Sequence, residues 1–119
     1  MTLVTLVTGF SASAREAAIA ALLDDFSSTA LILEGMPDGD ARFDRFGSAA
    51  DIQIKRIAPG CVCCIGNLTL RVTLNRILRH PPARLYLSLA TATHLDEIKQ
   101  FLIQAPYDAL LELTDDLCA

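Results

Sequence analysis

The sequence predicts an α/β fold with three layers: a mainly parallel sheet with helices on both faces. Short apolar runs alternate with segments in which apolar residues recur every three or four positions, the patterns of buried strands and amphipathic helices. Such alternation is typical of a parallel sheet covered by helices. The 52% hydrophobic and 20% charged residues argue against disorder. A chain of 119 residues accommodates one domain, so residues 1–119 are expected to form a single domain.

The N-terminal part is predicted to contain a strand, a glycine turn, a helix and a second strand. Residues 3–7 form an apolar run that precedes Gly9, and residues 30–33 form another that stops at Glu34. Between them, four residues with helical spacing are expected to share the buried face of a helix: Ile19, Leu22, Leu23 and Phe26.

The middle of the chain is predicted to be a long polar loop followed by an edge strand. Residues 36–50 contain two glycines and the acidic residues Asp38, Asp40 and Asp44, which we interpret as a solvated surface. Ile52 and Ile54 then alternate with polar residues, the pattern of a strand with one wet face.

The C-terminal half is predicted to hold two helices and two strands. The second helix has its apolar face at Leu70, Leu74, Ile77 and Leu78. Arg79 and His80 are expected in its last turn, where the helix dipole favours cations, before Pro81 ends it. A strand over 85–89, a third helix over 95–102 and a last strand over 109–113 follow.

Charge and the N-terminal sequence exclude two classes of partner. The net charge is −4 and the ten Lys and Arg residues are scattered, so the chain lacks the basic stripe that nucleic-acid binding requires. Residues 1–9 have no basic segment, and no apolar run is long enough for a signal or membrane span. We therefore expect a cytoplasmic protein that binds neither nucleic acid nor membrane.

The glycine turn stands where a phosphate-binding loop would lie. Such a loop has the pattern G-x-x-x-x-G-K-S/T between a strand and a helix. This chain has Gly9 in the first position, but Ala14, Arg15 and Glu16 replace the second glycine, the lysine and the hydroxyl. Ser13 and Glu16 also fit a capping box. We therefore predict a capped, self-neutralised helix start that binds no nucleotide.

Three cysteines form a compact cluster after Pro59-Gly60. Cys61, Cys63 and Cys64 offer three thiols within four residues, and adjacent Cα atoms, about 3.8 Å apart, are too close for an ordinary disulfide. In a reducing compartment this pattern indicates metal-binding or redox chemistry. Three thiolates could hold zinc or a similar thiophilic ion and leave one position open. The alternative is that the cysteines only fill apolar space.

These residues carry a family resemblance. The segment 60–72 resembles the metal-binding segment of the CobW-type P-loop GTPases, a group that includes metallochaperones. Thr8-Gly9-Phe10 resembles the start of that family's P-loop, 33–35 its acidic residue after the second strand, and 84–87 the strand leading to its Walker B segment. The resemblance implies a P-loop NTPase-like fold, of which this chain holds the N-terminal half only.

The chain departs from the family pattern at the nucleotide site. Ser88 stands where the family has a glutamate, Thr91 replaces a glycine, and the sequence stops at Ala119, before the guanine-specifying N-K-x-D segment. By comparison with the family, we identify the chain as a truncated, degenerate member with no catalytic residues.

Three further residues could complete a metal site: Glu34, His94 and Cys118. We interpret His94 as a helix N-terminal hydrogen-bonding residue and Cys118 as incidental, near a mobile terminus. Our first hypothesis for function is a non-enzymatic metal-binding module, accessory to metal trafficking and served by a protein partner. The alternatives are a pseudo-GTPase interaction module with vestigial cysteines and a residual GTP-binding protein. An open strand edge would favour a homodimer.

Overall fold

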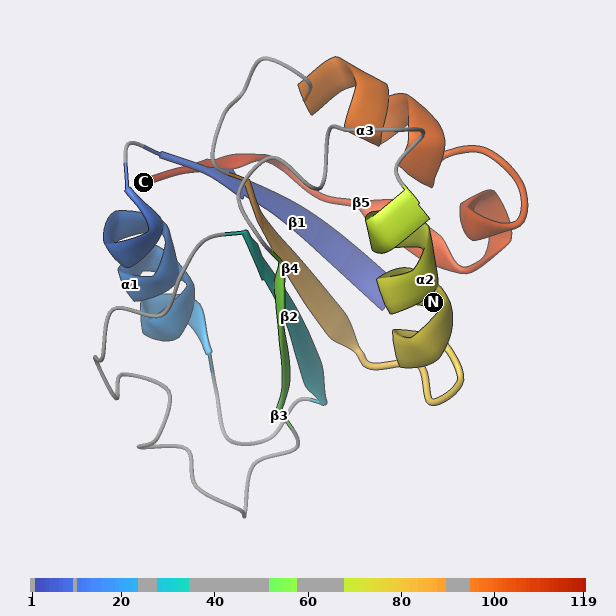
Figure 1. Cartoon of the computed structure of the whole chain (residues 1–119), viewed down its shortest axis with the longest axis horizontal. Coiled ribbons are helices and arrows are strands. Elements are labelled where there is room, and N and C mark those ends of the chain that lie inside the picture. The colour runs from blue at the N-terminus through green and yellow to red at the C-terminus, as the bar shows by residue number, and fades with distance from the viewer. Residues whose placement is uncertain (1, 10, 24–27, 35–51, 58–67, 90–94) are drawn as a thin grey trace.

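A computed structural model of the protein describes residues 2–9, 11–23, 28–34, 52–57, 68–89 and 95–119. These residues form a six-stranded sheet in the order β3-β2-β4-β1-β5, with β6 also paired to β1 (Figure 1). The strands are β1 (Thr2–Thr8), β2 (Thr29–Glu34), β3 (Ile52–Ile57), β4 (Arg84–Leu89), β5 (Leu111–Leu113) and β6 (Leu117–Cys118). The helices are α1 (Ala12–Leu22), α2 (Leu68–Ile77), α3 (Leu95–Leu102) and the short 3₁₀ helix η3 (Tyr107–Ala109).

Helices cover both faces of this sheet, so the structure has three layers (Figure 1). Because side chains alternate along a strand, Val4 and Leu6 of β1 pack with α2 and α3, whereas Val7 packs with α1. Every strand pairing in the described residues is parallel. The predicted α/β fold is therefore confirmed. No helix among the described residues is long and apolar enough to cross a membrane.

The strand register brings the carboxyl ends of the central strands together. Thr8 of β1 pairs with Leu89 of β4, and Leu33 of β2 pairs with Ser88 of β4. In parallel α/β sheets, ligands bind beyond this edge. The turn after β1 and the start of α1 lie at the same edge, so the residues that follow the strands meet there.

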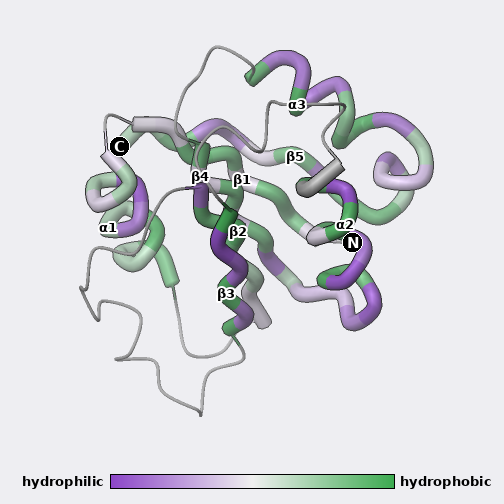
Figure 2. Tube along the Cα trace, in the orientation of Figure 1, coloured by the Kyte–Doolittle hydropathy of each residue, from purple (hydrophilic) through white to green (hydrophobic). Residues whose placement is uncertain are grey.

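Strand β3 lies at one edge of the sheet, as its sequence pattern predicts. It pairs with β2 from Thr29↔Ile52 to Glu34↔Ile57. Figure 2 shows hydrophilic positions along β3, in contrast to the hydrophobic β2 and β4. Its apolar residue Ile54 is 41% exposed, so even the face shared with α1 is only partly covered.

Three helix and strand boundaries differ from the predictions. Helix α1 ends at Leu22, which is 52% exposed, so the prediction that Leu22 lies on the buried face is wrong. Leu23, just past the helix, packs against the same cluster as Ile19, and Phe26 lies outside the described residues. Helix α2 ends at Ile77, and Arg79 and His80 follow it in a turn. The last predicted strand begins at Leu111 rather than at position 109, because residues 107–109 form η3.

The sequence pattern also missed β6. Leu117 and Cys118 pair with Val7 and Thr8 of β1, and the amide of Ala119 donates to the Thr8 carbonyl at 2.7 Å. Before it, the Thr114 amide donates to the Val4 carbonyl at 2.8 Å. The end of the chain is thus held against β1, and the expectation that Cys118 lies in a mobile tail is wrong. A two-residue strand is too short to produce a recognisable alternation.

Candidate functional site at the carboxyl ends of the central strands

The turn after β1 leads into α1 through a serine cap. The N-cap is Ser11, whose backbone is extended and whose Oγ accepts a hydrogen bond from the Ala14 amide at 3.1 Å. Ser13 lies inside the first turn of the helix. The predicted capping box of Ser13 and Glu16 is therefore wrong: the helix begins two residues earlier than that pattern requires.

Arg15 turns inward from α1 and joins the ends of three strands. Its Nε donates to Ser88 Oγ at 2.8 Å, its Nη1 to the Gly9 carbonyl at 3.1 Å, and its Nη2 to the Glu34 carbonyl at 2.7 Å. The residue is 2% exposed. One guanidinium therefore ties the residues that follow β1 and end β2 to the buried strand β4.

Two carboxylates compensate the charge of Arg15. Burial lowers the pKa of the Arg15 guanidinium from its ordinary value, because desolvation disfavours the charged form. The negative charges of Glu34 and Glu16 act in the opposite direction and raise that pKa. A buried cation is tolerated when hydrogen bonds and opposite charges replace the water that it loses, and Arg15 has both.

Glu16 forms an ion pair with an arginine of the edge strand. Arg56 of β3 donates to both carboxylate oxygens of Glu16, at 3.1 Å and 3.0 Å. The Glu16 side chain is 4% exposed and that of Arg56 is 29% exposed. This bidentate, charge-assisted pair ties α1 to β3. The predicted self-neutralised helix start counted only Arg15 and Glu16, and it did not include this cation from β3.

The space around Gly9 and Ser88 is occupied by atoms of this chain. Ser88 is fully buried, and its hydroxyl accepts from Arg15. A Cβ added to Gly9 would lie 2.9 Å from Ala119 Cβ, 3.0 Å from Ala119 O and 3.2 Å from Arg15 Cγ. Only glycine fits at this position, because the chain end and the arginine approach it from two sides.

The predicted metal ligands Cys61, Cys63 and Cys64 lie outside the described residues, as does His94. Glu34 lies at the end of β2 and pairs with Ile57, the last described residue before the cysteine segment. Cys118 lies in β6 instead, with its Sγ 3.8 Å from Thr8 Oγ1.

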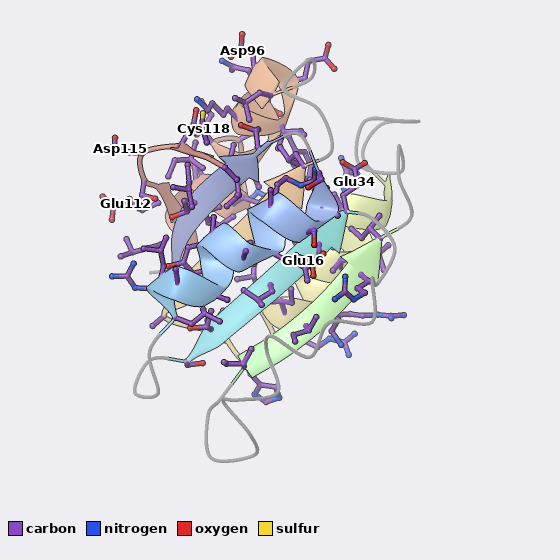
Figure 3. The ribbon with its side chains drawn as sticks, turned by 90° about the vertical axis from the view of Figure 1, so that its left-hand side faces the viewer. Glu16, Glu34, Asp96, Glu112, Asp115 and Cys118 are labelled. Atoms are coloured by element: carbon purple, nitrogen blue, oxygen red, sulfur yellow. The ribbon has the colours of Figure 1, made fainter. Side chains whose placement is uncertain are left out.

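The carboxylates of the described residues do not gather into a metal site. No group of three or more His, Cys, Asp or Glu side chains there could hold an ion. Figure 3 shows Asp96, Glu112 and Asp115 pointing outward from separate elements, while Glu16 and Glu34 lie near α1 and the end of β2.

Sequence reasoning identified the residues of the turn but missed their partners. In the sequence, Arg15 is recognisable only as the residue at the lysine position of a phosphate-binding loop. Its hydrogen bonds to Ser88 and to the Glu34 carbonyl join residues that are far apart in the sequence, so they depend on tertiary structure. Arg56 was not singled out, although its spacing from Ile52 and Ile54 places it on the strand face that α1 covers. The alternation of residues along β3 was the one sequence signal that could have identified Arg56.

Comparison with known proteins gives one informative similarity. The chain is 30% identical over 123 aligned positions to the zinc chaperone YeiR of Escherichia coli (strain K12), a CobW-family member. The alignment covers 99% of this chain and 37% of that relative, so the chain spans little more than a third of the relative's length. No family model matches the chain, and no solved structure matches it.

Replacement of Arg15 by methionine is predicted to lower the free energy of unfolding by about 3 kcal/mol. The change leaves the acceptors at Gly9, Glu34 and Ser88 without their donor, and it leaves buried carboxylates less compensated. Arg15→Lys should lose part of this stability, because an ammonium cannot reproduce a planar fork of donors. Urea unfolding followed by circular dichroism measures both.

Arg79→Met serves as the matched control, since Arg79 is exposed in the turn after α2. That variant should stay within about 0.5 kcal/mol of the wild type. Equal unfolding midpoints for Arg15→Met and Arg79→Met would contradict the role assigned to Arg15.

Proposed function

We propose that this protein is a non-enzymatic, CobW-type metal-binding protein that handles a zinc-like ion through Cys61, Cys63 and Cys64. The observation that carries the proposal is the similarity, across 99% of the chain, to a zinc chaperone. The three thiols within four residues supply ligands of the right chemistry for such an ion. The chain spans only 37% of that relative, so the relative's role does not transfer to this chain as a finding. We therefore propose, as further parts of this function, a role in metal trafficking and a protein partner that receives or supplies the ion.

The proposed chemistry is coordination and transfer rather than catalysis. Thiolates bind zinc at about 2.3 Å, and three of them leave a fourth position for a water, a residue of this chain or a ligand from the recipient protein. An open position permits the ion to be passed on by ligand exchange. The pairing of Glu34 with Ile57 supports Glu34 as an oxygen ligand, since the cysteine segment follows Ile57 by a few residues.

We further propose that the turn after β1 binds no nucleotide. The donors that would face a phosphate are engaged internally, because Arg15 donates to protein acceptors at its Nε, Nη1 and Nη2. Ser88 lacks the carboxylate that would help to hold magnesium and its water. Glu16 adds a negative charge close to the position of a phosphate, and charges at short range repel strongly. No catalytic residue is assigned.

Zinc is predicted to bind with a stoichiometry of about one ion per chain through the three clustered thiols. The variant with Cys61→Ser, Cys63→Ser and Cys64→Ser together should lose this binding, whereas Cys118→Ser, its control, should keep it. Affinity should fall as the pH is lowered, because protons compete with the ion for the thiolates, by up to about tenfold per pH unit for each proton released. Competition with a chromophoric chelator in reducing buffer measures this. Wild-type stoichiometry and affinity in the triple variant would exclude the site.

GTP and ATP are predicted not to bind in the presence of magnesium. Isothermal titration calorimetry of the folded, reduced protein should give only heats of dilution, for the wild type and for the triple cysteine variant alike. A magnesium-dependent dissociation constant in the low micromolar range would overturn the proposal for the turn after β1 and would favour a residual GTP-binding protein instead.

A homodimer is also proposed, formed through the edge strand β3, which pairs on one side only among the described residues and whose Ile54 is 41% exposed. Unpaired strand edges pair with other chains, and two-fold dimers are the commonest closed assemblies. Ile54→Lys should shift the mass measured by light scattering towards the monomer, whereas Ile103→Lys, at a residue 51% exposed in the turn after α3, should not. A wild-type monomer at high protein concentration would reject the dimer. A dimer seen only without chelator would assign it to the cysteines.

A further inference from the structure

A pocket of about 300 Å³ lies between α2 and the segment that follows α3. Arg71 and Asn75 line it from α2, four residues apart and therefore on one face of the helix. Phe101, Gln104 and Tyr107 line it from the end of α3 and from η3. The segment leads to Leu110, whose carbonyl accepts from the Thr2 amide, so the pocket lies towards the amino ends of the strands. It is separate from the Arg15 site.

The side chains that line this pocket hold one another in place. The guanidinium carbon of Arg71 lies 5.6 Å from the centroid of the Phe101 ring. The Phe101 and Tyr107 rings are 5.1 Å apart and tilted by 51°. The Tyr107 hydroxyl donates to Asn75 Oδ1 at 2.8 Å, and Tyr107 is only 3% exposed. This chain of contacts orients a cation and an amide towards the same space.

The polar groups of the pocket are predominantly hydrogen-bond donors. Arg71 forms no ion pair with any described residue, and a guanidinium has donors but no acceptor. Asn75 Oδ1 already accepts a hydrogen bond from Tyr107, so the Asn75 side chain has its NH₂ donor left to offer a ligand. No carboxylate lines the pocket, although the chain as a whole has a net charge of −4. The pocket is therefore a positively charged site on an acidic protein.

We propose that this pocket binds a small organic carboxylate, whose oxygens accept from Arg71 and Asn75 and whose apolar part lies against Phe101 and Tyr107. The planar guanidinium matches the geometry of a carboxylate. The aromatic walls favour an acid with an apolar or aromatic group over a bare inorganic anion, which would have no apolar part to place against those rings. The volume lies at the lower end of the range for ligand pockets, so the ligand is small.

The tyrosine content of the chain provides a direct assay. The protein has two tyrosines and no tryptophan, so a Tyr86→Phe background leaves Tyr107 as the only tyrosine fluorophore. The Tyr86 hydroxyl makes no hydrogen bond to any described residue, so its removal costs little. In this background phenylacetate should change the Tyr107 emission saturably, with a dissociation constant of about 1 mM or lower. The neutral isostere phenylacetamide should bind at least about tenfold more weakly.

Substitutions distinguish recognition of the carboxylate from general contact with the rings. Arg71→Gln and Asn75→Asp should each weaken phenylacetate binding by about tenfold or more, the first by removing the cation and the second by adding a negative charge. Arg79→Gln is the matched control, because Arg79 lies in the turn after α2, exposed and outside the pocket. This variant should bind phenylacetate as tightly as the background protein does.

Several outcomes would overturn the proposal. Equal affinity for phenylacetate and phenylacetamide would show that the carboxylate is not recognised, and this comparison needs no variant that might misfold. Unchanged affinity in a folded Arg71→Gln protein would do the same. Inorganic phosphate that binds as tightly as phenylacetate would identify a general anion site, and the absence of any saturable change in emission would exclude the pocket. None of these results depends on zinc binding by the cysteines.

Discussion

The buried guanidinium of Arg15 is the interaction on which the carboxyl edge of the sheet depends. Parallel strands end with unpaired backbone carbonyls at this edge, and buried carbonyls need donors. Arg15 supplies donors to the carbonyls of Gly9 and Glu34 and to the Ser88 hydroxyl. Because these acceptors belong to the ends of β1, β2 and β4, the Arg15 side chain helps to fix the relative positions of the three strands. The backbone hydrogen bonds between the strands do the same. The approach of Ala119 to Gly9 closes the same region from the other side.

Most of the fold could be predicted from the sequence because its signals are local. The runs at 30–33 and 85–89 became central strands buried on both faces, as apolar runs in a parallel sheet should be. The run at 3–7 became the central strand β1, in which Leu3 and Thr5 are half-buried. The alternation at Ile52 and Ile54 placed β3 at the edge. The predictions failed for elements that are short or set by tertiary context. The 3₁₀ helix η3 replaced the start of the last predicted strand. The two residues of β6 pair with β1 through backbone hydrogen bonds, which residues of any type can form.

The sequence predicted several residues of the site but not the contacts between them. Gly9 was identified as a residue that matches a phosphate-binding loop, and Arg15 and Glu16 as residues that depart from it. All three contribute to the buried network. Their partners come from positions 34, 56 and 88, and no sequence pattern states which distant residues a buried cation and a buried carboxylate will share. The capping prediction failed for a related reason: two serines compete for one cap, and Ser11 precedes the helix at the geometry that a cap needs.

The charge at the carboxyl edge bears on what can bind there. Arg15 and Arg56 carry two formal positive charges, and Glu16 and Glu34 carry two formal negative charges, so the formal charges of this set sum to zero without any ligand. A magnesium–nucleotide complex would add uncompensated negative charge to this balanced, largely buried set, and no cationic group of the described network would be free to receive it. A divalent ion with three thiolates adds only one negative charge, and it brings its own ligands. The balanced charges of this edge therefore disfavour a triphosphate more than they would disfavour a metal–thiolate site, so the proposed metal binding and the proposed lack of nucleotide binding are electrostatically compatible.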